Sequence, residues 1–290
     1  MSTKPVRPPG NEGHLSRLLG AWRDSQDTQI TEGRLRRLVG VTLIAAALDG
    51  LRDDEGRPRL VIKGGSALAL RFGFSARASQ DLDTAYRGSL DEALESIKAI
   101  LAQGHQGFVG RLGPEEPIVR AGVTPPPIRT KIKLDYTRGS RRPFVTIPFE
   151  ISAAEGASLD EPDEAAISIS LAPVQLDTPP SIAFLPLPYQ IAQKLHACTD
   201  DNGADLRVHD LMDILFIKEI AVEESDYPAI RLACEEIFAG RGKQPWPPTI
   251  AVRAGWADQW TRLMEVEGTP ITLDQAVADV SDLVETIAAS

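Results

Sequence analysis

Apolar residues near the start of the chain recur at the spacing of one helix face. Leu35, Leu38, Val39 and Leu43 illustrate the pattern. The segment from about residue 12 to residue 53 is therefore expected to form two helices.

The pattern changes after the turn-forming segment DDEGRPR, where short apolar runs replace the helical repeat. Such runs, bounded by glycine, proline or acidic residues, are typical of strands, and the stretch after Ser89 has the N-cap and apolar spacing of a helix. We expect strands at residues 60–63, 81–86, 107–112, 129–137 and 144–151, and helices at residues 64–71 and 89–103.

Helical spacing returns in the last part of the chain. We expect helices at about residues 188–199, 205–219, 223–239 and 272–287. The whole pattern predicts an α/β (α+β) protein with a mixed sheet and a C-terminal helical domain. We place the boundary near residue 185, which divides the chain into residues 1–185 and 186–290.

Composition narrows the class of protein only slightly. A hydrophobic content of 42% and a charged content of 25% are ordinary for a globular chain. No run approaches the roughly 20 apolar residues of a membrane-spanning helix, and the N-terminus lacks a signal-peptide core, so we expect a cytoplasmic protein. Cys198 and Cys234 lack the spacing of zinc ligands and are expected to be buried thiols.

The net charge of −10 argues against broad, sequence-independent binding of nucleic acids, which depends on Lys and Arg. It leaves room for a local basic surface or for clusters that only keep the protein soluble. Three clusters are candidates: Arg34, Arg36 and Arg37; Arg129, Lys131 and Lys133; and Arg138, Arg141 and Arg142.

Asp81 and Asp83 stand two residues apart in a predicted strand. Side chains alternate between the faces of a strand, so both carboxylates should project to the same side. Such a pair suits either an exposed strand edge or a divalent cation between the oxygens. Asp81 and Asp83 are therefore candidate catalytic residues and metal ligands.

Gly64, Gly65 and Ser66 follow a predicted strand and open the next helix. Backbone N–H groups at a helix N-terminus bind phosphate, and glycine leaves them unshielded, although glycine pairs also form plain turns. Their position one helix ahead of the Asp-x-Asp strand favours a phosphate site. Three polar residues between the two motifs complete the candidate nucleotide-binding set: Arg71, Arg77 and Ser79.

These residues resemble two signature motifs of the AbiEii/AbiGii toxin family, a branch of the polymerase-β-like nucleotidyltransferases. The motifs stand here as GGS-x-L-x-x-R at residues 64–71 and R-x-S-x-D-L-D at residues 77–83. The resemblance implies a polymerase-β-like core, an NTP substrate, and Mg²⁺ or Mn²⁺ on Asp81 and Asp83. Thr84 departs from the family, which usually has a bulky apolar residue there.

Two further motifs follow in the order of the family. It has a lysine in a sequence like KLHA and aspartates in a sequence like KDLxDL, and this chain has QKLHA and HDLMDI. The resemblance thus implies catalytic roles for Lys194 and Asp210 and a nucleotide-binding role for Asp213. His209 stands where the family often has lysine.

Helical spacing alone places Asp210 and Asp213 on one stripe with Leu206 and Ile217. That stripe should face protein, where two like charges are expected beside a cation such as Lys194. A purely structural ion pair remains an alternative, more so for Asp213 than for Asp210.

Asp135 lies on another predicted strand, in phase with Lys131 and Lys133. Polymerase-β-like transferases commonly place a third acid on a neighbouring strand, so the resemblance makes Asp135 a candidate catalytic residue. Its charged face either lines the site or is simply solvated.

The resemblance also implies a function. The chain is expected to be a toxin of a type IV toxin–antitoxin system that transfers NMP to RNA, with the tRNA 3′ end as the leading acceptor, and so blocks translation. A cognate antitoxin is an implied partner. The alternatives are transfer to a protein hydroxyl and a catalytically silent nucleotide-binding or antitoxin-binding module.

Overall fold

The chain divides into two compact units. Unit 1 comprises Met1–Ala154 and Pro162–Leu185, and unit 2 comprises Glu155–Glu161 and Pro186–Ser290. The computed structural model describes residues 7–26, 30–119, 124–139, 143–200, 207–267 and 271–290. Arg141, Arg142 and Leu206, which the sequence singled out, lie outside the described residues.

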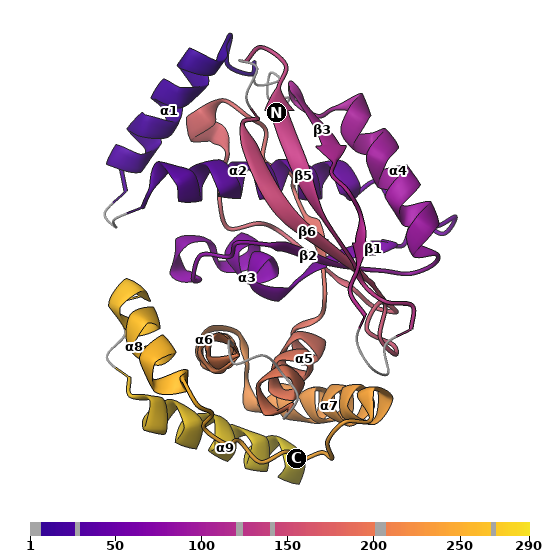
Figure 1. Ribbon diagram of the computed structural model, residues 1–290, viewed down its shortest axis with the longest axis vertical. Coiled ribbons are helices and arrows are strands. Elements are labelled where there is room, and N and C mark those ends of the chain that lie inside the picture. Colours follow the sequence, from indigo (N-terminus) through magenta and orange to yellow (C-terminus); the bar gives the residue numbers. More distant parts are fainter. Residues whose placement is uncertain (1–6, 27–29, 120–123, 140–142, 201–206, 268–270) are drawn as a thin grey trace. The chain divides into compact units, whose positions relative to one another are not determined.

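A mixed β-sheet forms the centre of unit 1 (Figure 1). Its strand order is β3-β5-β6-β2-β1-β8-β7, and β4 also pairs with β5. Strand β2 is parallel to β6, whereas β1 with β2 and β5 with β6 are antiparallel. The strands are β1 (Leu60–Lys63), β2 (Leu82–Tyr86), β3 (Phe108–Leu112), β4 (Glu116–Pro117), β5 (Ile128–Tyr136), β6 (Val145–Ala153), β7 (Asp163–Ala165) and β8 (Ile182–Phe184).

The mixed α/β class predicted from the sequence is confirmed. Strands β1, β2, β3, β5 and β6 occur where the short runs in the sequence predicted them, with ends that differ by at most two residues. Sequence analysis missed β4, β7 and β8, because strands of two or three residues are too short to show an alternating pattern.

Helices cover one face of this sheet. The helices of unit 1 are α1 (Glu12–Asp24), α2 (Glu32–Leu48), α3 (Gly64–Phe72) and α4 (Leu90–Gln103). Helix α2 packs closely on β6, since a Cβ added to Gly40 would lie 2.5 Å from Val145 Cγ1 and 3.1 Å from Ile147 Cδ1. Helix α4 packs on β3 through Leu101, which contacts Gly110. The buried residues of β5 and β6 therefore face these helices, and their polar residues face the other way.

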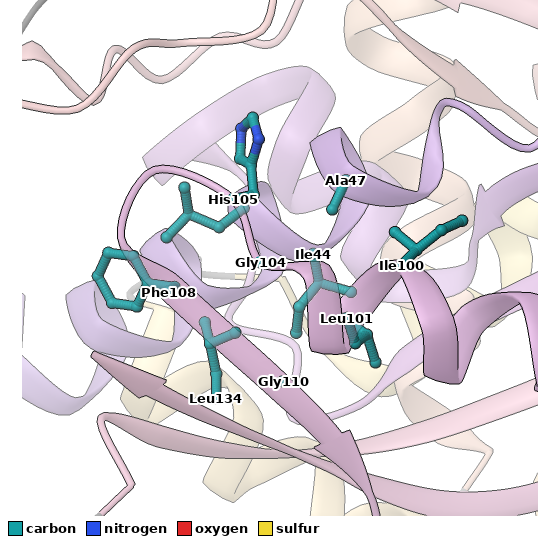
Figure 2. A pocket seen from close by; sticks show the side chains of 10 residues that line it. Ile44, Ala47, Ile100, Leu101, Gly104, His105, Phe108, Gly110 and Leu134 are labelled. Carbon is teal, nitrogen blue, oxygen red and sulfur yellow. The ribbon is translucent and has the colours of Figure 1, made fainter. Parts of the chain in front are cut away.

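A cavity of about 10 Å³ remains between α2, α4, β3 and β5 (Figure 2). Apolar side chains line it, among them Ile44, Leu101, Phe108 and Leu134. A space of this size holds at most one water molecule. It is a packing irregularity of the core and has no room for a ligand.

Unit 2 is built of helices. They are α5 (Leu187–Thr199), α6 (Val208–Ala221), α7 (Tyr227–Arg241), α8 (Trp256–Glu267) and α9 (Leu273–Ala289). Helix α8, which lies in the stretch after the proline-rich segment, was not predicted from the sequence. The helix predicted to start at residue 223 begins at Tyr227.

Segment Glu155–Glu161 belongs to unit 2 although its neighbours on both sides belong to unit 1. Arg241 Nε and Nη2 donate to the two oxygens of Glu155, each at 2.9 Å, and Gln193 Nε2 donates to Oε2 at 2.6 Å. These bonds tie the segment to α5 and α7. Such an excursion is invisible in the sequence, since it depends on partners far along the chain.

Cys198 and Cys234 are both buried, as expected from the sequence. Burial raises the pKa of each thiol, so both are inert packing residues. None of the helices in the described parts of the chain is long and apolar enough to cross a membrane.

Candidate functional site

Asp83 of β2 packs directly against the glycine turn that opens α3. Gly64 has a φ of +64°, and a Cβ added to it would lie 2.5 Å from Oδ2 of Asp83. The carboxylate can come this close because Gly64 has no side chain, and the backbone conformation there also favours glycine. The structure thus brings together the glycine pair and the Asp-x-Asp motif.

Because Gly65 has no side chain, two further polar side chains can lie close to the same turn. A Cβ added to Gly65 would lie 3.0 Å from Ser79 Oγ and 3.4 Å from Arg77 Nη2. Ser66 and Ser79 both donate hydrogen bonds to the backbone carbonyl of Asp81, the latter at 3.1 Å. The start of α3 is therefore lined by backbone N–H groups, hydroxyls and a guanidinium, which together favour an anion.

Helix α2 holds the loop that presents Arg77 and Ser79. Arg34 Nη2 donates to Ala76 O at 2.7 Å, and Arg37 Nη1 donates to Gln80 O at 2.7 Å. Arg36 instead bonds Glu32 and Ser16. The first predicted basic cluster thus fixes the loop and the helix, and does not form an open cationic surface.

Arg71 has a different place from the one expected for a phosphate ligand. Its Nη2 donates to Asp163 at 2.8 Å and to Leu185 O at 3.2 Å, and its guanidinium lies 4.4 Å from the centre of the Phe184 ring. Burial lowers the pKa of this guanidinium, which remains charged beside Asp163. These contacts tie α3 to β7 and β8, strands that the sequence did not reveal.

A row of charged residues crosses the sheet at Asp83. In the sheet register Lys63 of β1 lies opposite Asp83 of β2, and Asp83 lies opposite Glu150 of β6. Glu150 in turn lies opposite Arg129 of β5. Lys63 Nζ donates to Ser152 Oγ at 2.8 Å, and Arg129 Nη2 donates to Glu150 at 3.2 Å. Two neighbouring carboxylates are thus flanked by a cation on either side.

Glu150 was not among the candidate residues predicted from the sequence. Alternation along the segment FEISA could have placed its side chain on the polar face of a strand. Its position beside Asp83 depends on the parallel pairing of β2 with β6, which are far apart in the chain and carry no local signal of register. Thr84, the departure from the family pattern, supports this pairing by donating to Glu150 O at 3.0 Å.

The structure does not bring Asp135 to this row. Asp135 pairs with Arg111 of β3 and lies six residues along β5 from Arg129, roughly 20 Å at the rise of a strand. Glu150 is the acid on the strand next to β2, and Asp135 lies on the same face of the sheet but toward the other end of β5.

The carboxylates fit a hard divalent cation. Asp83 is half-buried and lies on the face of β2 opposite the buried Leu82 and Thr84, and Asp81 immediately precedes β2 and is exposed. Among the described residues, no three His, Cys, Asp or Glu side chains are grouped as a complete metal site. Mg²⁺ commonly takes one or two carboxylates together with phosphate oxygens and water, and these aspartates supply such ligands.

Unit 2 contains a separate buried cluster on α5 and α6. Lys194 Nζ lies 3.0 Å from Asp210 Oδ1 and 2.6 Å from Asp213 Oδ2, and the three side chains are almost fully buried. Both aspartates share the stripe with Ile217 that helical spacing predicted. Oδ2 of Asp210 accepts no hydrogen bond from the described residues and lies 3.5 Å from Arg207 Nη1. Asp213 is held by the lysine, and Asp210 keeps acceptor capacity for a further group.

The close contact at Gly64 gives a first prediction. Replacing Gly64 with Ala should lower the free energy of unfolding by about 1–2 kcal/mol through its left-handed backbone. It should also lower nucleotidyl transfer by about 10²-fold or more, because the new methyl displaces Asp83.

Gly56→Ala is the matched control. Gly56 has a φ of +79° but nothing within 4 Å of an added Cβ, so the backbone cost is similar and no contact is disturbed. Thermal unfolding and transfer rates of both variants separate the two effects. Equal rates for the two variants would show that the close approach of Asp83 to Gly64 has no functional meaning.

Comparison with known proteins gives the family that the chain resembles. The family model of the AbiEii nucleotidyl transferase toxins, a type IV toxin–antitoxin system, matches residues 46–279. No curated protein sequence matches the chain. Among solved structures, the nucleotidyltransferase toxin MenT4 from Mycobacterium tuberculosis aligns with a TM-score of 0.54 at 15% identity, covering 96% of this chain and 97% of MenT4. JHP933 from Helicobacter pylori aligns with a TM-score of 0.47 at 16% identity, covering 87% and 92%.

Proposed function

The chain belongs to the AbiEii family of nucleotidyltransferase toxins, and we propose that it transfers NMP from an NTP to the 3′ end of tRNA and so blocks translation. The family resemblance of the motifs, confirmed by the match over residues 46–279, supports nucleotidyl transfer. The fold shared with MenT4 is that of a nucleotidyltransferase.

The observation that most supports this function is the packing of Asp83 against Gly64, beside Glu150. A carboxylate pair next to a phosphate-binding turn suits a triphosphate whose charge is shared with a cation. Mg²⁺ or Mn²⁺ on Asp81 and Asp83 would neutralise charge that develops on the phosphate oxygens.

The residues of the chain then have distinct tasks. The N–H groups of Gly65 and Ser66, with Arg77 and Ser79, hold the triphosphate, and Arg71 acts indirectly by anchoring α3. The hydroxyl of the acceptor attacks the α-phosphorus, the bond to pyrophosphate breaks, and Glu150 receives the hydroxyl proton. We also propose that Lys194 and Asp210 take part in transfer, since Asp210 retains an oxygen without a hydrogen bond from the described residues.

The test is to incubate the protein and Mg²⁺ with each labelled NTP, in the presence of total tRNA or of cell protein. Label in tRNA that is removed by 3′ exonuclease supports the proposal. Label in protein instead would establish transfer to a protein hydroxyl. Binding of NTP without any product or pyrophosphate would identify a silent module, and a cognate antitoxin should suppress the reaction.

The proton acceptor gives a second prediction. Glu150→Gln should lower kcat about 10²-fold or more, because the amide cannot take the proton, while KM for NTP changes little. Asp135→Asn removes one carboxylate from the same sheet but lies beside Arg111, so kcat should stay close to that of the wild type. The reverse order of effects would assign the third carboxylate to Asp135.

A further inference from the structure

The polar face of β5 carries positive charge that leads away from the carboxylates. Residues of β5 alternate between buried and exposed, so Arg129, Lys131 and Lys133 share the exposed face. Arg111 of β3 pairs directly with Lys133 and extends this face. These four residues form what is called here the β5 cationic row.

Nearby acids neutralise only part of the row. Arg129 pairs with Glu150 and Arg111 pairs with Asp135. Lys131 and Lys133 have no acidic partner among the described residues. Like charges directly opposite one another, as at Arg111 and Lys133, destabilise a sheet. In a chain with a net charge of −10, this surplus of positive charge is local and suits an anionic partner.

The row is continuous with the site of Asp83. Arg129 lies opposite Glu150 in the sheet register, and Glu150 lies opposite Asp83. Lys131 and Lys133 follow Arg129 at roughly 7 and 13 Å along the strand. A linear polyanion with one end at the carboxylates would therefore pass along β5. An extended RNA strand with a reactive 3′ hydroxyl has this shape and charge.

We propose that the acceptor strand of the RNA lies along the β5 cationic row, with its 3′ end toward Asp83 and its phosphates against Lys131 and Lys133. This inference rests on the proposed function and adds the path of the substrate. The orientation follows because the 3′ hydroxyl must reach the carboxylates while the remaining phosphates extend away from them.

The row contacts the backbone of the strand and does not read its bases. The exposed face of β5 presents Arg129, Lys131, Lys133 and Asp135, with no aromatic side chain on which a base could stack. Phosphate contacts position a strand without regard to sequence. Any choice among RNA acceptors must therefore come from other parts of the protein.

Charge reversal in the full-length protein tests the proposal. The probe is a short fluorescein-labelled single-stranded oligoribonucleotide with a free 3′ hydroxyl, and its binding is measured by anisotropy at several salt concentrations. For Lys131→Glu with Lys133→Glu, we expect at least tenfold weaker binding. The slope of log K against log salt should fall in magnitude by about 1.4, at roughly 0.7 per lost contact. Binding of Mg²⁺-NTP should not change.

Two matched variants serve as controls. Arg17→Glu with Arg59→Glu makes the same change of net charge at two exposed arginines away from β5 and should leave RNA binding unchanged. Lys131→Arg with Lys133→Arg keeps the charge and should retain binding.

Each outcome decides one of the two proposals. If the wild type transfers NMP to RNA and the β5 reversal binds RNA as tightly as the control, the path along β5 is wrong and the proposed function stands. If the wild type does not transfer NMP to RNA, the proposed function fails and the path fails with it. Binding of polyglutamate in preference to the oligoribonucleotide would assign the row to an acidic protein and overturn the proposal.

Discussion

Replacing Asp83 with Asn is expected to lower the rate of nucleotidyl transfer by at least about 10³-fold, equivalent to roughly 4 kcal/mol of transition-state stabilisation. Asp83 is the carboxylate that contacts the turn at Gly64, and it lies opposite Glu150 of the neighbouring strand. The amide has the same shape but no charge, so it cannot balance a cation next to the triphosphate. Single-turnover rates with labelled NTP and tRNA measure the effect.

The same variant should remain folded. Asp83 and Glu150 are like charges on adjacent parallel strands, so removing one of them relieves repulsion. We expect the midpoint of thermal unfolding to stay level or to rise slightly. If a well-folded Asp83→Asn protein transfers NMP at the normal rate, Asp83 takes no part in the reaction. A large loss of stability would show that its role is structural.

Replacing Lys194 with Met is expected to lower the free energy of unfolding by about 3–5 kcal/mol. Lys194 lies 3.0 Å and 2.6 Å from oxygens of Asp210 and Asp213, and all three side chains are buried. Without the ammonium group, the two buried carboxylates would lose the cation that contacts both of them, although Arg207 and His209 lie near Asp210. Denaturant unfolding of the variant measures the loss.

A triple variant separates stability from catalysis at this cluster. Lys194→Met combined with Asp210→Asn and Asp213→Asn removes every charge of the cluster, so most of the lost stability should return. If Lys194 and Asp210 take part in transfer, activity stays lost in the restored protein. Full activity in the triple variant would show that the cluster has only a structural role. Stability that does not return would show that packing, and not charge, dominates there.

Short-range signals in the sequence were enough to predict that the glycine turn and the Asp-x-Asp motif lie together. Gly64, Gly65, Ser66, Asp81 and Asp83 lie within one strand–helix–strand segment, so spacing alone predicts that they meet. The stripe of Asp210 and Asp213 is likewise set by the period of a single helix. In the structure Asp83 packs against Gly64, Ser66 bonds the carbonyl of Asp81, and Asp210 and Asp213 both contact Lys194.

Long-range pairing decided the rest. Glu150, and not Asp135, lies beside Asp83 because β6 pairs with β2, and Arg71 is enclosed because the short strands β7 and β8 close over it. The fold class, the motifs and the strand or helix faces of their side chains could be predicted from the amino-acid pattern, since these depend on local spacing. The neighbouring strands and the paired charges could be identified only in the folded chain, because register between distant segments depends on contacts that no local pattern encodes.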